Sequence, residues 1–517
     1  MSRLEQSGKN IIFSFVGNIL SALLGLVSRT VFIAVLGADY LGLAGLLGNV
    51  LGFLAISELG IATAIGFSLY KPLAERDYKS VSALMSLYRR AYRVIGLIVF
   101  VAGIGLFFSL DFFVPPAEQP AGTDFAYFTF LATTVFGYFL SYKTTLINSD
   151  NRAYRIMPLG IVMNVVQTFA QIAVLLIWRS YIIYLIVQLA CSLLLMVLQN
   201  RFITREYKEV DFRTKEKISD EQRSTIRKNV GGLIIQKIGD YLVNSTDNLI
   251  ITKFVSLAAT GIYSNYLMIR NLVNAYIGTF FTGTSAAMGN VVAVETDERK
   301  RELFDTMMFG AFFIYSFEAV CFMCLFNPFI GEVWIGEKFV FDTFTVAMIV
   351  VNNYLTGLRI PLITMKGASG TYLEDSWVPF AFAGINLAAS IILAKVLGVA
   401  GVFLGTIIGS LCTADWYRPV LIYRKVFHAP VRLYFKRYVL YVFLGLGYTA
   451  LGWKICSYIE LPVPILSLLA KGVVAAALPV GLNVLLFRRT KEFEAVRVMA
   501  GRIRNGIRKK LARRKAQ

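Results

Sequence analysis

The stretch IIFSFVGNILSALLGLVSRTVFIAVL (11–36) contains one charged side chain, Arg29, in an otherwise uncharged run. The run exceeds the roughly 20 residues that a helix needs to cross the hydrocarbon core of a membrane. Lipid offers the backbone no hydrogen-bond partner, so the run must be helical. It is too long for the apolar core of a signal peptide, and a second apolar run follows almost at once. The stretch therefore predicts a first membrane-spanning helix.

Similar runs recur along the whole chain of 517 residues, which is 56% hydrophobic and only 16% charged. Soluble domains carry about a quarter charged residues. Continuous runs also exclude an outer-membrane barrel, which has short alternating segments. The sequence predicts an all-α integral membrane protein with about fourteen transmembrane helices, separated by turn residues such as Gly37, Pro115-Pro116 and Gly398. The expected spans are 11–36, 41–69, 92–114, 124–147, 156–177, 182–200, 230–255, 257–290, 304–326, 341–363, 376–395, 399–418, 438–458 and 463–486.

The net charge of +20 is distributed unevenly over the predicted loops. Most Lys and Arg residues fall on the side that also holds both termini, and cytoplasmic loops are the ones enriched in these residues. Both termini are therefore expected in the cytoplasm. The basic tail 488–517 is either a topology signal or a segment that lies on anionic lipid headgroups. This distribution indicates membrane topology, and we expect no nucleic-acid partner. The predicted outward side carries only Arg179, Lys253, Lys338, Lys395 and Lys454.

An internal repeat relates the two halves of the chain at an offset of 219 residues, which places Gly42 on Gly261. The repeat predicts two six-helix lobes around a central cavity, a plan common among transporters. A basic linker separates the lobes, and a helix pair lies outside the repeat. The predicted parts are an N-terminal lobe (1–203), a cytoplasmic linker (204–229), a C-terminal lobe (230–418), an extra helix pair (437–487) and a cytoplasmic tail (488–517).

Polar residues recur at steps of three or four in the first and seventh spans, so each helix presents one polar stripe. The offset brings the two stripes into the same register, which predicts a water-filled cleft lined by both helices. The first stripe is Ser14, Asn18, Ser21, Gly25, Ser28 and Arg29, and the second is Lys237, Asp240, Asn244, Asp247 and Asn248.

Charged residues inside spans are costly and usually face a cavity or a partner. Arg29, Arg270 and Lys237 are candidates for a cationic cavity, and arginine suits phosphate because its planar fork donates two parallel hydrogen bonds. Structural alternatives remain open. Lys237 can pair with Asp240 on its own helix, Arg29 can pair with Glu58, and Arg270 can bind a carbonyl or Asp247. Near predicted span ends, Arg359, Asp415 and Lys471 are expected to reach the membrane interface.

Aromatic and amide side chains cluster around Arg270 and offer flat faces and hydrogen bonds for sugars, unless they are ordinary packing residues. The candidates are Tyr263, Tyr266, Asn271 and Asn274. The sequence contains no Walker loop, no HExxH and no nucleophile elbow. We therefore expect no catalytic residue, no metal site and no cofactor.

Two stretches resemble a known family. These are RTVFIAVLGADYLGLAGLLGNVLGFLAISELGIATAI (29–65) and VPFAFAGINLAASIILAKVLGVAGVFLGTIIGSL (378–411). They are similar to polysaccharide flippases of the Wzx type, within the multidrug/oligosaccharidyl-lipid/polysaccharide exporter superfamily. The resemblance implies alternating-access transport of an oligosaccharide on a polyprenyl pyrophosphate across the bacterial cytoplasmic membrane. Membrane lipids and other polysaccharide-assembly membrane proteins would be its partners.

In this interpretation Arg29, Arg270 and Lys237 would hold the pyrophosphate. The polar residues Glu58, Asp240, Asn244, Asp247 and Asn248 would line the cavity, and the carboxylates among them would couple transport to H⁺ or Na⁺. One alternative is a multidrug or organic-cation exporter of the same superfamily, whose site would be acidic. Another is a membrane-embedded glycan polymerase, for which no sizeable outward loop is available.

Overall fold

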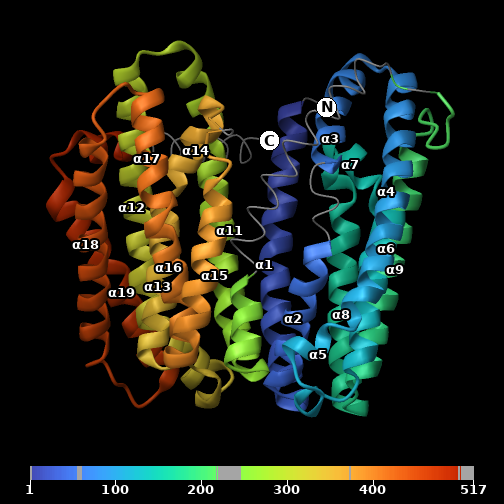
Figure 1. Ribbon diagram of the computed structural model, residues 1–517, viewed down its shortest axis with the longest axis horizontal. Helices are drawn as coiled ribbons and strands as arrows, with labels where there is room; N and C mark the ends of the chain where they lie inside the picture. Colours follow the sequence, from blue (N-terminus) through green and yellow to red (C-terminus); the bar gives the residue numbers. More distant parts are fainter. Residues whose placement is uncertain are drawn as a thin grey trace, which may run out of the picture. The chain divides into compact units, whose positions relative to one another are not determined.

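The computed structural model describes residues 3–54, 61–216, 218, 246–371, 374–498 and 501 (Figure 1). Within these residues the secondary structure is helical, with no strand. Ten of the described helices are long and apolar enough to cross a membrane, and a shorter apolar helix covers Ala38–Leu54. The prediction of an all-α integral membrane protein is confirmed. Of the predicted spans, 230–255 lies largely outside the described residues.

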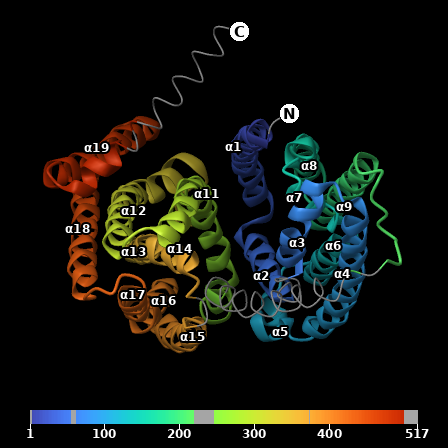
Figure 2. The same ribbon diagram turned by 90° about the horizontal axis from the view of Figure 1, so that it is seen from above.

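The chain divides into two compact units, residues 1–265 and residues 266–517. The division falls inside α11 (Leu257–Val294), whereas the sequence places the lobe boundary at 204–229. In the first unit, α1 packs against α8, α8 against α9, α9 against α6, and α6 against α4 (Figures 1 and 2). Its helices are α1 (Arg3–Leu36), α2 (Ala38–Leu54), α3 (Ile61–Glu75), α4 (Tyr78–Phe107), α5 (Leu110–Phe113), α6 (Thr123–Ser141), α7 (Thr144–Ser149), α8 (Met157–Trp178) and α9 (Tyr181–Glu206).

The second unit is built around α12, which contacts α13, α14, α18 and α19. The helix pair α18 and α19 lies at the edge of this unit (Figure 2). Its helices are α12 (Asp297–Asn327), the π-helical turn η4 (Pro328–Trp334), α13 (Thr343–Leu358), α14 (Ile360–Ser369), α15 (Val378–Leu397), α16 (Val399–Cys412), α17 (Ala414–Lys425), α18 (Arg432–Cys456) and α19 (Pro464–Phe487).

Helix boundaries follow the predicted turn residues. Gly37, with φ +91°, separates α1 from α2, and Gly398, with φ +59°, separates α15 from α16. Both are conformations that glycine adopts readily and other residues rarely adopt. Pro115 and Pro116 follow α5, where the missing N–H groups prevent the helix from continuing.

The internal repeat is visible in the helix starts. Ala38 and Leu257 begin α2 and α11, and Tyr78 and Asp297 begin α4 and α12; each pair is 219 residues apart. The capping is repeated as well. The side chain of Asp77 accepts a hydrogen bond from the Ser80 amide, and that of Thr296, at the equivalent position, accepts one from the Arg299 amide. Both halves therefore use the same helix-starting chemistry at equivalent positions.

Repeat-related glycines meet within the first unit. A Cβ atom on Gly42 would lie 2.0 Å from the carbonyl oxygen of Leu257, and one on Gly261 would lie 2.1 Å from that of Ala38. The contact is symmetrical under the 219-residue offset, since Leu257 corresponds to Ala38 and Gly261 to Gly42. The backbones of α2 and α11 thus touch, and backbone cannot move aside as a flexible side chain can.

We expect Gly42→Ala and Gly261→Ala each to destabilise the protein by about 1–3 kcal/mol, the usual cost of overpacking. The measurement is thermal unfolding of the purified protein in detergent. Gly45→Ala is the matched control on the same helix, because its Cβ would meet only a Thr260 methyl at 3.7 Å. Melting temperatures for the two variants equal to that of Gly45→Ala would show that the helices can separate without cost.

Candidate functional site

The polar stripe of α1 lines a cavity of about 340 Å³ in the first unit. Ser21, Gly25, Ser28 and Arg29 form its α1 wall, as expected for residues that share one face of a helix. The remaining walls come from α2, α6, α8 and α9. Their lining residues are Leu41, Ala44, Phe130, Asn164, Thr168, Tyr181, Tyr184, Leu185 and Gln188. The described lining therefore combines one guanidinium, several neutral polar groups and aromatic rings, with no carboxylate.

Arg29 is held by two hydrogen bonds to one residue. Its Nη1 donates to the Ser264 carbonyl oxygen at 2.8 Å, and its Nη2 donates to Ser264 Oγ at 2.9 Å. These two bonds orient the guanidinium toward Ser264. Ser264 Oγ in turn donates to the Gly261 carbonyl at 2.6 Å, which ties the orientation of Arg29 to the glycine contact.

Aromatic rings form the part of the cavity wall next to Arg29. The ring centroids of Phe32 and Tyr184 lie 5.2 Å apart in an edge-to-face arrangement, and Tyr181 and Tyr184 stack at 6.2 Å. Ring faces of this kind can pack against the apolar face of a sugar, while the amides of Asn164 and Gln188 on the same wall can bond to its hydroxyls.

A second cavity of about 370 Å³ continues along the stripe past Ser14 and Asn18. It shares Ser21 and Asn164 with the first cavity, and Asn164 Nδ2 donates to Ser21 Oγ at 2.9 Å. The two cavities therefore adjoin along α1. The sequence predicts that this stripe faces the one in the seventh span, but Lys237, Asp240 and Asn244 of that stripe lie outside the described residues, as does Glu58.

The remaining members of the second stripe, Asp247 and Asn248, lie on a described helix at 246–254. The Asn248 carbonyl accepts a hydrogen bond from Thr252 Oγ1 at 2.8 Å. Their assignment to a substrate cavity or to ion coupling stays a prediction.

Of the predicted sugar contacts, Tyr263 and Tyr266 are buried, at 3% and 0% exposed. The Tyr266 hydroxyl donates to Asn327 Oδ1 at 2.7 Å and accepts from the Phe341 amide at 2.8 Å. This bonding favours the packing alternative for Tyr266. Asn271 is exposed, next to Arg270, and remains available to a ligand.

Asn274, one helical turn after Arg270 on α11, belongs to a polar network in the second unit. Tyr315 Oη donates to Asn274 Oδ1 at 3.3 Å, Asn274 Nδ2 donates to Asn353 Oδ1 at 3.0 Å, and Asn353 Nδ2 donates to Glu318 Oε2 at 3.0 Å. Three helices, α11, α12 and α13, contribute to it. The sequence analysis missed Asn353, and it also missed Asn164 and Gln188 of the first unit, because each is an uncharged amide outside the two predicted polar stripes.

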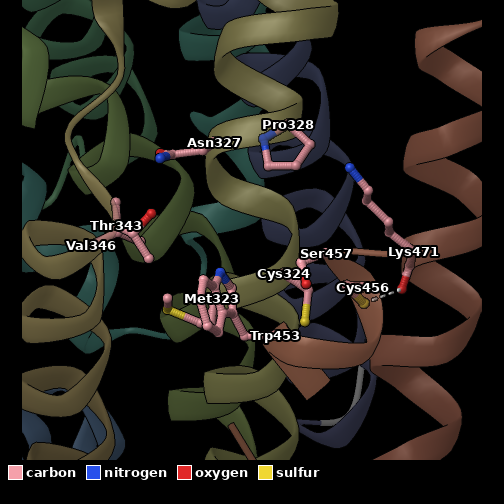
Figure 3. A pocket seen from close by; sticks show the side chains of 10 residues that line it. All are labelled: Met323, Cys324, Asn327, Pro328, Thr343, Val346, Trp453, Cys456, Ser457 and Lys471. Carbon is pink, nitrogen blue, oxygen red and sulfur yellow. Dashed lines mark hydrogen bonds between the residues drawn. The ribbon is translucent and has the colours of Figure 1, made fainter. Parts of the chain in front are cut away.

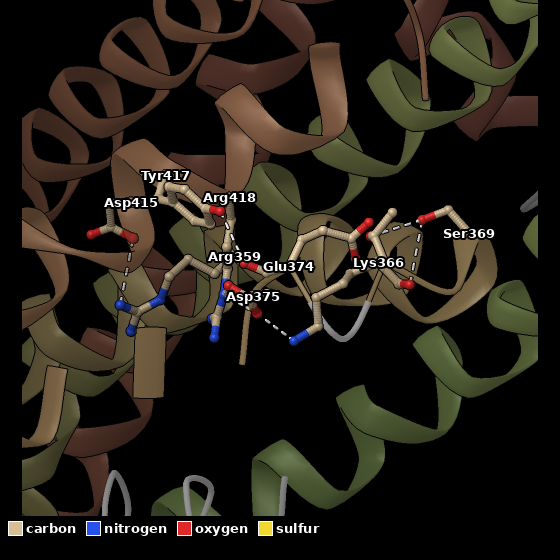
Figure 4. Close-up of polar contacts among 9 residues, drawn as sticks. Arg359, Lys366, Ser369, Glu374, Asp375, Asp415, Tyr417 and Arg418 are labelled. Carbon is tan, nitrogen blue, oxygen red and sulfur yellow. Dashed lines mark hydrogen bonds and ion pairs between the residues drawn. The ribbon is translucent and has the colours of Figure 1, made fainter. Parts of the chain in front are cut away.

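Ion pairs join α14, α17 and the segment between α14 and α15 in the second unit (Figure 4). The Asp375 carboxylate is fully buried and pairs with Lys366 and, at 3.1 Å, with Arg418. Arg359 pairs with Asp415 at 3.5 Å, both largely buried. Each of these two residues therefore has a charged partner inside the second unit, and their expected reach to the membrane interface stays a prediction.

Glu374 and Lys425 form a more exposed pair at 2.7 Å (Figure 4). This hydrogen bond from Lys425 holds the pKa of Glu374 below its usual value.

Lys471 lines a smaller cavity of about 110 Å³ with Asn327, Trp453 and Ser457 (Figure 3). It is 9% exposed, and its Nζ lies 3.9 Å from a Glu332 carboxylate oxygen. The neighbouring Cys324 and Cys456 are free thiols in the structure. We assign this cavity to packing between α12, α18 and α19.

No family model and no curated protein matches the sequence. Solved structures do match. A lipid II flippase, MurJ, in an inward closed conformation superposes with a TM-score of 0.62 at 11% identity, over 92% of this chain and 99% of that one. An inward-facing multidrug resistance MATE family transporter of the MOP superfamily superposes with a TM-score of 0.58 at 16% identity, over 76% of this chain and 92% of that one. A Vibrio cholerae MATE transporter superposes with a TM-score of 0.55 at 11% identity, over 82% of this chain and 97% of that one. The chain thus has the fold of MOP superfamily membrane transporters.

We expect Arg359→Met to destabilise the protein by about 3 kcal/mol, because it leaves Asp415 as an uncompensated buried charge. The double variant Arg359→Met/Asp415→Leu should recover most of that loss. The measurement is denaturation of the purified protein in detergent. Lys425→Met is the matched control, since it removes an exposed pair worth about 1 kcal/mol or less. A loss for Lys425→Met equal to that for Arg359→Met would contradict the assignment.

Proposed function

We propose that the chain is a flippase that moves a polyprenyl-pyrophosphate-linked oligosaccharide across the bacterial cytoplasmic membrane, with both termini in the cytoplasm. The observation that carries this proposal is the cavity beside Arg29, where a guanidinium oriented by Ser264 lies beside aromatic rings and amides. A pyrophosphate needs a cation that can donate paired hydrogen bonds, and a glycan needs ring faces and amides. The cavity supplies both kinds of group.

Alternating access is supported by the fold. Structures similar to this chain include an inward-facing and an outward-facing conformation of a MATE family transporter, the latter with a TM-score of 0.53 at 16% identity. We propose the same exchange here. One similar structure belongs to a lipid II flippase, which supports a lipid-linked substrate. The proposal assigns no catalytic residue.

The second candidate is a multidrug or cation exporter, because two of the similar structures are of a multidrug resistance MATE family transporter. An organic cation needs a carboxylate or a set of carbonyl groups at its site. The described lining of both cavities along α1 contains Arg29 and no Asp or Glu. This charge favours an anionic substrate, so we place the cation exporter second.

The first experiment is to deplete the protein and measure carrier-linked sugars on each membrane face. We expect repeat units linked to the polyprenyl carrier to accumulate on the cytoplasmic face while surface glycan falls. An unchanged carrier pool, together with new sensitivity to cationic dyes, would instead support the cation exporter.

We expect Arg29→Gln to reduce transport about tenfold or more, equivalent to about 1.4 kcal/mol, because the cavity loses its fixed charge. Arg29→Lys should retain part of the activity, since it keeps the charge but not the planar fork. Transport is measured by accessibility of the labelled glycan in vesicles, with the amount and melting temperature of inserted protein checked in parallel. Arg179→Gln, an exposed arginine outside the spans, is the control. Full transport by well-inserted Arg29→Gln would show that Arg29 is a structural tie.

A further inference from the structure

Glu318 is the most deeply buried carboxylate of the polar network in the second unit, with 2% of its surface exposed. Its Oε2 accepts the hydrogen bond from Asn353 Nδ2 at 3.0 Å. Its Oε1 is buried and has no hydrogen-bond partner among the described residues. A buried polar atom without a partner costs about 1–3 kcal/mol, so one in a native bundle calls for an explanation.

The network has a direction. Each donor points along the chain from Tyr315 through Asn274 and Asn353 to Glu318, which is the final acceptor. The packing holds the first donor in place, since a Cβ on Gly357 of α13 would lie 2.1 Å from the Tyr315 ring. The amides can therefore not turn their donors away from Glu318 without breaking the chain. The network delivers one hydrogen bond to the carboxylate and leaves the second oxygen open.

The charged and titratable groups around Glu318 are few. Tyr315 and Cys321 lie on its own helix α12, and the guanidinium of Arg270 on α11 is close enough for a Coulombic interaction. The α13 contribution is the neutral Asn353. Arg270 is the cation among these groups, and it lies one helical turn before Asn274 on α11, whose amide bonds to Asn353.

The open Oε1 suits a proton better than a metal cation. Hard cations need several oxygen ligands. In this network Asn353 Oδ1 already accepts from Asn274, and Asn274 Oδ1 already accepts from Tyr315. Glu318 would then be the main source of oxygen ligands, and one carboxylate supplies fewer ligands than Na⁺ needs. A proton needs one oxygen, and a neutral carboxyl group also avoids the cost of burying a charge in the bundle.

We propose that Glu318 is a proton-binding site of the second unit, and that its proton controls how much positive charge Arg270 presents to an anionic ligand. When Glu318 is ionised, it neutralises part of the Arg270 charge. When it is protonated, Arg270 is uncompensated and binds an anion more tightly. By linkage, binding of the anion must also favour binding of the proton. The control of anion binding at Arg270 rests on the proposed anionic substrate, whereas the proton site at Glu318 does not.

The proton site is tested without any substrate by infrared difference spectroscopy of the purified full-length protein between low and high pH. We expect a carbonyl band of a protonated carboxyl group that disappears as pH rises and that is missing in Glu318→Gln. Glu332→Gln, which changes a more exposed glutamate of the same unit, is the matched control and should keep the band. A pH-dependent difference spectrum of Glu318→Gln identical to that of the wild type would overturn the proton site.

The link to Arg270 is tested with farnesyl pyrophosphate as a short polyprenyl probe, by measuring its Kd across the same pH range. We expect the wild type to bind about fivefold or more tightly at low pH than at high pH, at the lower end of typical coupling. Glu318→Gln should bind tightly at both pH values, apart from the probe's own titration, which is common to all variants. Equal pH dependence in wild type and Glu318→Gln would overturn the link.

The two tests separate the two proposals. A normal infrared band with no binding of farnesyl pyrophosphate at any pH would overturn the proposed anionic substrate and the link to Arg270, while the proton site would stand. If the wild-type infrared band changes with Na⁺ at fixed pH, the site binds a metal cation and the proton assignment is wrong.

Discussion

The backbone contact between Gly42 and Gly261 is the constraint on which the candidate site of the first unit depends. Any side chain at either position would meet a carbonyl oxygen at about 2 Å, far inside van der Waals contact. Because the helices touch there, Ser264 comes within reach of Arg29, and Ser264 Oγ bonds back to the Gly261 carbonyl. One close approach of two backbones thus sets the orientation of the cavity's guanidinium. Residues of each repeat contribute one half of this contact.

Polar groups in the bundle fall into two kinds. Asn386 on α15 accepts bonds from Ser390 and Thr406, and Arg359 pairs with Asp415, so these groups fasten helices together. In hydrocarbon such bonds must be made within the protein, since no water is available. Glu318 differs, because its hydrogen-bond partner among the described residues is the neutral amide of Asn353, whereas Asp415 is paired with Arg359. An open oxygen alone does not make this distinction, since Asp415 Oδ2 is also buried without a hydrogen-bond partner among the described residues.

The fold is shared with transporters that are only 11–16% identical to this chain. Such divergence is understandable for a helical membrane protein, since any apolar side chain satisfies the lipid and backbone bonds are made within each helix. The positions of the helix breaks and of the close contacts between helix backbones must be retained. The Gly401 and Gly405 positions of α16 show this, because a Cβ at either would lie within 2.3 Å of α15. The stretch 378–411 forms this tight hairpin.

The sequence alone determined the all-α membrane class, the breaks between helices and the repeat, because apolar run length, turn residues and helix starts are local properties. It also determined which residues of α1 share a face with Arg29, since helical periodicity is local too. Only the tertiary structure decided what that face meets: it brought Asn164 of α8 and Gln188 of α9 to the cavity beside Arg29. The tertiary structure also decided the burial of Tyr266, the pairing of Arg359 with Asp415, and the open oxygen of Glu318. A helical period shows which side chains lie together on one helix, but the partner helix is chosen by packing between segments far apart in the chain.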